Sequence, residues 1–195
     1  MAVLAQVANN KPLFLFVGMS ASGKTTIASM LEREGYTQIS SYTTRPKRYD
    51  SEPGHVFITE DEYDKLENIM ASTLYNGYRY CTTLEQIQNA DIYVVDVEGV
   101  STLLHNYHRL NRSVHVVYFA SNTHTRIQRM IARGDSDTTI VGRLLNDEKT
   151  NWLDELYKCC ELSNKPVDIH IVNADLEIQQ VYPAIKKILD YPTLD

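Results

Sequence analysis

The sequence predicts an α/β fold with a mainly parallel sheet flanked by helices. Apolar runs typical of buried strands occur at residues 13–17, 91–97, 114–119 and 169–174, and each has a helical stretch before or after it. Parallel strands need a crossover connection, which usually contains a helix, so this alternation favours helices on both faces of the sheet. Because no repeat or low-complexity linker interrupts the 195 residues, we expect one domain over residues 1–195.

The composition excludes several classes of protein. Hydrophobic residues make up 43% and charged residues 23% of the chain, which are ordinary globular values. A net charge of -6 argues against duplex nucleic acid as a partner, which usually requires a basic face. No apolar run approaches the ~20 residues of a spanning helix, residues 1–11 lack the basic start of a secretory signal, and the cysteines lack zinc spacing. We expect a cytoplasmic protein with reduced thiols and no membrane partner, in an oligomeric state that the composition leaves open.

The first strand leads through a loop into a helix. Residues 24–34 place Ile27, Met30 and Leu31 at helical spacing, and Gly35 follows as a typical stop. Residues 42–83 differ, because they form short segments rich in tyrosine, and residues 59–62 (TEDE) match a helix capping box. We interpret residues 42–89 as an inserted lobe, with the core at residues 12–41 and 90–195.

The loop after the first strand fits the pattern GxxxxGK[ST]. In this pattern glycines let backbone N–H groups converge on phosphate oxygens, the helix N-terminus adds partial positive charge, and the lysine supplies an ammonium. The sequence therefore predicts a site for the β- and γ-phosphates of ATP, with the Thr25 hydroxyl on Mg²⁺. The predicted ATP-binding residues of the loop are Gly18, Ser20, Ala21, Ser22, Gly23, Lys24, Thr25 and Thr26. The alternative is a turn that only joins strand to helix, which would leave the burial of a lysine unexplained.

A basic segment, SSYTTRPKR at residues 40–48, stands out in an acidic chain. It contains Arg45, Lys47 and Arg48 together with hydroxyl side chains. Guanidinium groups bind phosphate oxygens in pairs, so the segment predicts a pocket for a small dianion. The alternative is a basic loop that only contacts solvent.

In this order, the chain presents the phosphate loop, SSYTTRPKR, GYRYCTT, DVEGV, RMIARG with a later Arg143, and IVNADL. This succession resembles the guanylate kinase family, from about Leu13 to the final helix. The resemblance implies a P-loop kinase fold, with a core that carries ATP, a small monophosphate-binding lobe and a lid over about residues 126–145. It also implies transfer of the γ-phosphoryl group of MgATP to a nucleoside monophosphate, such as GMP or dGMP, giving ADP and the diphosphate.

The same resemblance implies roles for individual side chains. It assigns the acceptor phosphate to Ser41, Arg45, Arg48 and Tyr80, and it aligns His55 with a further phosphate ligand. It places Thr82 and Asp96 beside the acceptor base and Asn173 beside the ATP base. Asp96 could instead act on the metal through a bound water. Three of these residues have a structural alternative: His55 as a packed or solvated histidine, Asp96 as a helix cap, and Asn173 as part of an ordinary turn that Asn173 or Asp175 caps.

Arginines recur at the expected lid. Arg126, Arg129 and Arg133 fall along one face of a predicted helix, and such a stripe on its own is typical of a solvated face. The resemblance implies that Arg133 and Arg143 flank the lid and act on the transferred phosphoryl group together with Lys24 and Arg45, with Arg129 as a further candidate.

One position departs from the family pattern. Where the family carries a glutamate that reads guanine, this chain has Ala71, which offers no side-chain acceptor. Unpaired base N–H groups would each cost about 1–3 kcal/mol, so strong selection for guanine is not expected. Two alternatives stay open: a kinase of another phosphorylated small molecule, such as a sugar phosphate, and an inactive binding module of the same fold. The intact Lys24 and Thr25 argue against the binding module.

Overall fold

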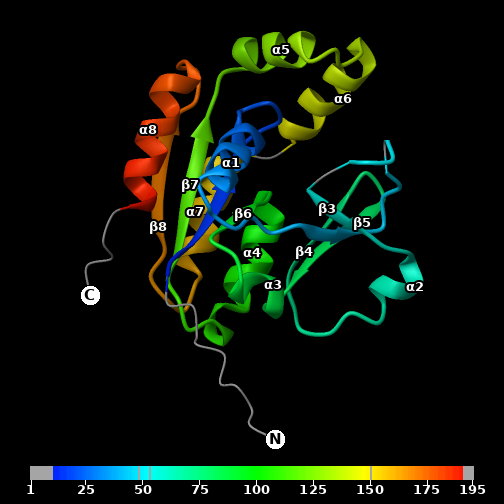
Figure 1. Cartoon of the computed structure of the whole chain (residues 1–195), viewed down its shortest axis with the longest axis vertical. Helices are drawn as coiled ribbons and strands as arrows, with labels where there is room; N and C mark the ends of the chain where they lie inside the picture. The colour runs from blue at the N-terminus through cyan, green and yellow to red at the C-terminus, as the bar shows by residue number, and fades with distance from the viewer. Residues whose placement is uncertain (1–10, 48, 53, 150, 191–195) are drawn as a thin grey trace, which may run out of the picture.

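The structure is a computed structural model that describes residues 11–47, 49–52, 54–149 and 151–190. Two sheets lie side by side (Figure 1). In the described residues the first sheet has four strands, all parallel, in the order β6-β1-β7-β8. Their bounds are β1 (Leu13–Val17), β6 (Ile92–Val94), β7 (Val114–Ala120) and β8 (Asp168–Asn173). The predicted α/β fold with a parallel sheet is confirmed.

Helices cover both faces of this sheet. Side chains alternate along a strand, so Leu13, Leu15 and Val17 of β1 enter one hydrophobic cluster while Phe14 and Phe16 enter the other. The cluster of Phe14 and Phe16 is closed by α1 (Lys24–Arg33) and α8 (Ile178–Leu189). The opposite cluster is closed by α4 (Val97–His105) and α7 (Trp152–Glu161).

The second sheet comes from the segment between α1 and β6. Its strands are β2 (Ser41–Thr43), β3 (His55–Phe57), β4 (Ile69–Tyr75) and β5 (Tyr78–Thr83), in the order β3-β2-β5-β4. Asn76 and Gly77, with φ of 51° and 79°, make the tight turn of the β4–β5 hairpin, which needs left-handed backbone at both positions. The short helices α2 (Glu60–Tyr63) and α3 (Leu84–Gln88) complete this part, and the predicted capping box at residues 59–62 is present at α2.

Two helices follow β7 at the end of the molecule toward which β7 and β8 point (Figure 1). They are α5 (Thr123–Ala132) and α6 (Asp137–Asp147), and Ser136 caps α6 by accepting the N–H of Thr139. A 3-10 turn, η1 (Tyr107–Arg109), follows α4.

The strand predicted at residues 91–97 was too long. The strand β6 ends at Val94, and α4 begins at Val97. The cause is Asp96, whose carboxylate accepts the N–H of Gly99 at 2.8 Å and so starts the helix.

The described residues contain no helix long and apolar enough to cross a membrane. Cys81, Cys159 and Cys160 are not paired in disulfides.

Arg112 ties three parts of the core together from a buried position. Its guanidinium donates to the carbonyl oxygens of Ile87 (3.0 Å), Ala90 (2.7 Å) and Pro12 (2.7 Å). The side chain is almost fully buried, and burial lowers the pKa of its guanidinium. It therefore joins the end of α3 to the residue just before β1.

We expect Arg112→Met to lower the free energy of unfolding by about 2–4 kcal/mol, because buried carbonyls left without donors cost about 1–3 kcal/mol each. Urea unfolding of both proteins would measure the change. A loss below about 0.5 kcal/mol, the size of an ordinary surface substitution, would contradict this role.

Candidate functional site

The loop between β1 and α1 packs directly against the end of β7. At Gly18 a Cβ atom would lie 2.8 Å from the carbonyl oxygen of Phe119, so a side chain has no room there. Gly23, with φ of 101°, turns the chain into α1 through left-handed backbone that favours glycine. The two glycines of the pattern are thus required by the local geometry, and the loop lies at the carboxyl edge of the parallel sheet.

Lys24 folds back over this loop. Its Nζ donates to the carbonyl oxygens of Gly18 (2.6 Å) and Met19 (2.9 Å) and to Oγ of Ser22 (3.3 Å). Burial lowers the pKa of Lys24 to about 8, although the nearby carboxylate of Asp147 favours the charged form. An anion in the loop would raise this pKa again, because opposite charges stabilise each other strongly where water is excluded.

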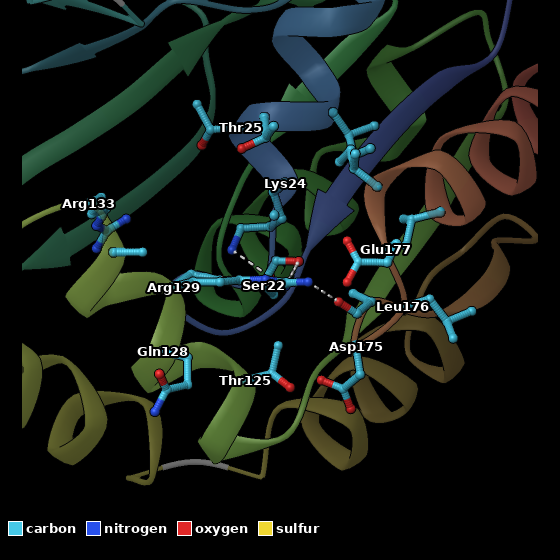
Figure 2. Close-up of a pocket in the computed structure, with 18 of the residues that line it drawn as sticks. Ser22, Lys24, Thr25, Thr125, Gln128, Arg129, Arg133, Asp175, Leu176 and Glu177 are labelled. Atoms are coloured by element: carbon cyan, nitrogen blue, oxygen red, sulfur yellow. Dashed lines mark hydrogen bonds between the residues drawn. The ribbon is translucent and has the colours of Figure 1, made fainter.

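A cavity of about 810 Å³ opens beside the loop. Its walls are the first turn of α1, the helix α5 and residues 174–178 between β8 and α8. Figure 2 shows Lys24 and Arg129 reaching toward it from different elements, with Asp175 and Glu177 on another wall. Thr25 and Thr26 expose their side chains at the same cavity. Its volume is in the range of cofactor and nucleotide sites.

Arg129 links the phosphate loop to the end of β8. Its guanidinium donates to the carbonyl oxygen of Ala174 at 2.7 Å, and to those of Ala21 at 3.4 Å and Ser22 at 3.3 Å. Arg126, one turn earlier, is buried. Neither arginine belongs to a solvated face, and the alternative of a solvent-facing arginine stripe is wrong for these two positions.

Asn173 does not line the cavity, whose wall begins at the next residue, Ala174. Its Oδ1 accepts the N–H of Asp175 at 3.0 Å, which is the capping alternative. Asp175 in turn accepts from the Ser121 hydroxyl at 2.9 Å and from the N–H of Asn122 at 3.0 Å. These contacts fix the turn at this wall and leave any contact of Asn173 with a base as a prediction.

The basic segment of the second sheet brings Arg45 against an acid. The guanidinium of Arg45 donates to both carboxylate oxygens of Glu52, at 2.8 and 3.2 Å, and lies over the ring of Phe57. The side chains of Arg45 and Glu52 are 10% and 7% exposed, so this fork is shielded from water. Arg48 lies outside the described residues.

Three further predicted acceptor ligands come together around His55. Oγ of Ser41 lies 3.0 Å from Nδ1 of His55, and the His55 ring meets the edge of the Tyr80 ring with centroids 5.6 Å apart. The hydrogen bond to Glu52 raises the pKa of Arg45, burial opposes this rise, and a hydrogen bond to Tyr80 adds to it. The structure therefore clusters Ser41, Arg45, His55 and Tyr80 on β2, β3, β5 and the adjoining loop.

The positions predicted beside the acceptor base have other contacts. Ala71 is fully buried in β4, in the cluster beneath α4, and pairs with Thr82 across the sheet. The Thr82 hydroxyl is buried and donates to Oε1 of Gln86 at 2.8 Å. Burial raises the pKa of the Asp96 carboxyl, and the Gly99 N–H that it accepts opposes that shift. Asp96 therefore caps α4, as its structural alternative predicts, and it lies at the same sheet edge as the phosphate loop.

Asp135 holds both predicted lid arginines. The guanidinium of Arg133 donates through Nε to Oδ1 of Asp135 at 2.9 Å and through Nη2 to Oδ2. Nε of Arg143 lies 3.7 Å from the same carboxylate. Arg133 also lines the cavity. One acid between α5 and α6 thus sets the separation of the two arginines.

Sequence reasoning missed three acids of the site: Glu52, Asp135 and Asp147. Glu52 and Asp135 lie within ten residues of the arginines that they bind, and opposite charges at such short range were a usable signal. Asp147 contacts Ser20 across 127 positions, and no local pattern marks such a pair.

No protein-family model and no curated protein sequence matches the chain. Among solved structures, a guanylate kinase from Anaplasma phagocytophilum matches with a TM-score of 0.56 and 16% sequence identity, covering 96% of this chain and 89% of that one. Polyphosphate kinase 2 from Arthrobacter aurescens TC1 matches with a TM-score of 0.49 and 16% identity, covering 93% of this chain and 68% of that one. The chain has a P-loop kinase fold. At 16% identity the first likeness shows the fold alone.

The donor atoms at the loop fit Mg²⁺ better than a softer metal. Thr25 offers an exposed hydroxyl in the first turn of α1, and Asp96 offers a carboxylate at the neighbouring strand end. Mg²⁺ prefers such oxygen ligands and retains several waters. The described residues contain no group of three or more His, Cys, Asp or Glu side chains that could hold a metal ion on their own.

The lowered pKa of Lys24 predicts a pH-dependent effect of its removal. Because the folded pKa is about 8 and the ordinary value is 10.5, the folded state binds fewer protons than the unfolded state between these two values. The buried charge therefore destabilises the fold fully below pH 8, and the penalty fades as pH rises toward 10.5. We expect Lys24→Met to raise the free energy of unfolding by about 1–3 kcal/mol at pH 7 and by much less at pH 10.

Urea unfolding at the two pH values measures this difference. Lys158→Met, which removes an exposed lysine paired with Glu155 on α7, is the matched control and should change stability by less than about 0.5 kcal/mol. A gain from Lys24→Met that is equal at both pH values would show that the charge of Lys24 is not the cause.

Proposed function

We propose that this protein is an ATP-dependent phosphotransferase that transfers the γ-phosphoryl group to a small phosphorylated acceptor, a nucleoside monophosphate of the guanylate kinase type. The observation that carries the proposal is Lys24 on a GxxxxGK[ST] loop between a parallel strand and a helix, beside a cavity of about 810 Å³. In this proposal the loop and the N-terminus of α1 bind the β- and γ-phosphates, and the nucleoside lies along α5.

Lys24 would exchange its present partners when ATP binds. Its Nζ now donates to loop carbonyl oxygens of Gly18 and Met19, and phosphate oxygens in the loop would take over those hydrogen bonds. Thr25, with Asp96 through a water, would hold Mg²⁺, which neutralises charge on the β- and γ-phosphates when bound. Hydrogen bonds from the Lys24 ammonium to ionised phosphate oxygens are stronger than those to neutral carbonyl oxygens, so the exchange favours binding.

The cluster on the second sheet is the candidate site for the acceptor phosphate. Arg45 already binds a carboxylate in a two-pronged fork, and a phosphate presents oxygens that suit the same fork. Ser41 and Tyr80 add hydroxyl donors, and His55 adds a ring nitrogen. Arg48 would be a second guanidinium of this pocket on the basis of the sequence. The acceptor would displace Glu52 from Arg45 as it binds.

Arg133 and Arg143 would act on the phosphoryl group in transfer. Developing charge on that group is stabilised by preorganised cations, and no covalent intermediate is required. Closure of the lid with both substrates bound would keep water, the competing acceptor, away from the reaction.

The contacts of the base region favour one second candidate. Ala71 has no polar side chain, and Thr82 is fully buried with its hydroxyl proton donated to Gln86, so neither side chain is exposed to accept the N–H groups of guanine. A phosphorylated acceptor without such N–H groups, such as a sugar phosphate, would lose nothing by their absence. A nucleotide acceptor with relaxed base selection is equally consistent with these two positions.

The deciding experiment is ADP production from MgATP across ribo- and deoxyribonucleoside monophosphates and sugar phosphates. Lys24→Met should abolish turnover with the preferred acceptor, while the matched Lys158→Met should keep it. Turnover with sugar phosphates alone would replace the nucleotide proposal by the second candidate. Silence across the panel, with ATP still bound, would overturn both in favour of a binding module.

Arg45→Met tests the assignment of the acceptor pocket. Loss of a two-pronged charged hydrogen bond is worth about 1.5–3 kcal/mol, so we expect the KM for the acceptor to rise about 10- to 100-fold with little change in the affinity for MgATP. Arg79→Met is the control in the same sheet, because Arg79 pairs with exposed Glu60 and Asp64. An equal loss of MgATP affinity would place Arg45 elsewhere in the reaction.

A further inference from the structure

A buried carboxylate joins the phosphate loop to α5 and α6. Oδ2 of Asp147 accepts the backbone N–H of Ser20 at 2.9 Å and a guanidinium N–H of Arg126 at 2.7 Å, while Oδ1 accepts the Ser20 hydroxyl at 3.2 Å. The backbone carbonyl of Asp147 accepts the indole N–H of Trp152 at 3.0 Å. Asp147 and Arg126 are 4% and 2% exposed. The Asp147–Arg126 pair is therefore shielded from bulk water.

Helix stability does not account for the carboxylate. Asp147 is the last residue of α6, where the helix dipole is negative and an acidic side chain is unfavourable. Burial of a charge adds a further cost unless the charge is paired and hydrogen-bonded. Both costs are offset by the contacts with Ser20 on the loop and Arg126 on α5, and neither partner belongs to α6.

The geometry ties two parts of the proposed reaction to one group. On one side, Asp147 holds the loop backbone at Ser20, two residues after Gly18. On the other side, it fixes the end of α6, and Arg143 lies four residues earlier on the same helix, about 6 Å along its axis. Arg126 completes the link, because its guanidinium also donates to Oγ1 of Thr123 at the start of α5.

We propose that Asp147 is a positioning residue, whose carboxylate sets the shape of the phosphate loop and the place of Arg143 relative to it. This inference rests on the proposed phosphoryl transfer for its kinetic consequence, but the hold on the loop stands independently of any reaction. The negative charge is compatible with phosphate binding nearby because Arg126 compensates it at 2.7 Å.

Two variants separate positioning from a merely structural role. Asp147→Asn keeps the side-chain volume and one acceptor oxygen but leaves Arg126 without its counter-charge. The double variant Arg126→Met with Asp147→Leu removes both buried charges and keeps apolar volume, and such replacements often preserve or raise stability. Arg112→Met is the control for lost stability, because its partners Ile87, Ala90 and Pro12 lie outside the site.

Amide hydrogen exchange of the loop, residues 18–26, MgATP affinity and melting temperature are measured for all four proteins. We expect the double variant to melt no lower than the wild type, to exchange the loop amides at least tenfold faster, and to bind MgATP at least tenfold more weakly. Asp147→Asn should also exchange the loop amides faster and bind MgATP more weakly than the wild type. If the double variant does not fold, the loop exchange of Asp147→Asn tests the proposal in its place. Arg112→Met should melt lower with loop exchange and affinity unchanged.

Loop exchange and MgATP affinity of the double variant within twofold of the wild type would overturn the proposal and leave Asp147 a structural residue. A wild-type protein that does not bind MgATP would instead refute the proposed function. Loop exchange in the variants would then decide the positioning role by itself.

Discussion

The phosphate loop can lie against the sheet only because Gly18 has no side chain. A Cβ atom at Gly18 would lie 2.8 Å from the Phe119 carbonyl oxygen, so the loop and the end of β7 are in direct contact. That contact depends on the parallel register of β1 and β7, in which Val17 is opposite Tyr118. Since α5 begins shortly after β7, the same register brings the arginines of α5 around the loop. One close approach between backbones therefore organises the edge of the sheet.

The cations of both candidate pockets, at this edge and on the second sheet, have partners within the protein itself. Lys24 contacts loop carbonyl oxygens, Arg45 contacts Glu52, and Arg133 contacts Asp135. Such pairing orders the side chains before any ligand arrives, which reduces the conformational entropy lost on binding. It also means that an incoming anion must compete with an existing oxygen at each position. Binding would then be an exchange of hydrogen-bond partners, and anions with little negative charge would compete poorly with the protein's own oxygen atoms.

The parts that the sequence predicts well are those with local causes. Glycines at residues 18 and 23 are set by backbone geometry within one loop, the capping box at residues 59–62 is closed within one turn, and buried strands show in their apolar runs. The error at β6 has the same origin, because the apolar run continues through Val97 while the carboxylate of Asp96 has already started a helix.

The remaining contacts depend on chain segments that only the fold brings together. Asp147 reaches Ser20 over 127 positions, and the burial of Arg126 follows from where α6 ends. An arginine stripe on a helix looks alike in sequence whether it contacts solvent, backbone or acid. The place of Thr82 beside a base stays a prediction, and the structure adds that its hydroxyl donates to Gln86.

The Asp147–Arg126 pair restricts how this chain can change over time. Replacing either residue alone leaves the other as an unpaired buried charge, which is strongly destabilising, whereas replacing both together by apolar residues often preserves stability. The two positions are therefore coupled, and a single substitution at one of them is a poor intermediate. A lineage that has acquired the pair will tend to keep both members or lose both, although they lie 21 residues apart in the chain.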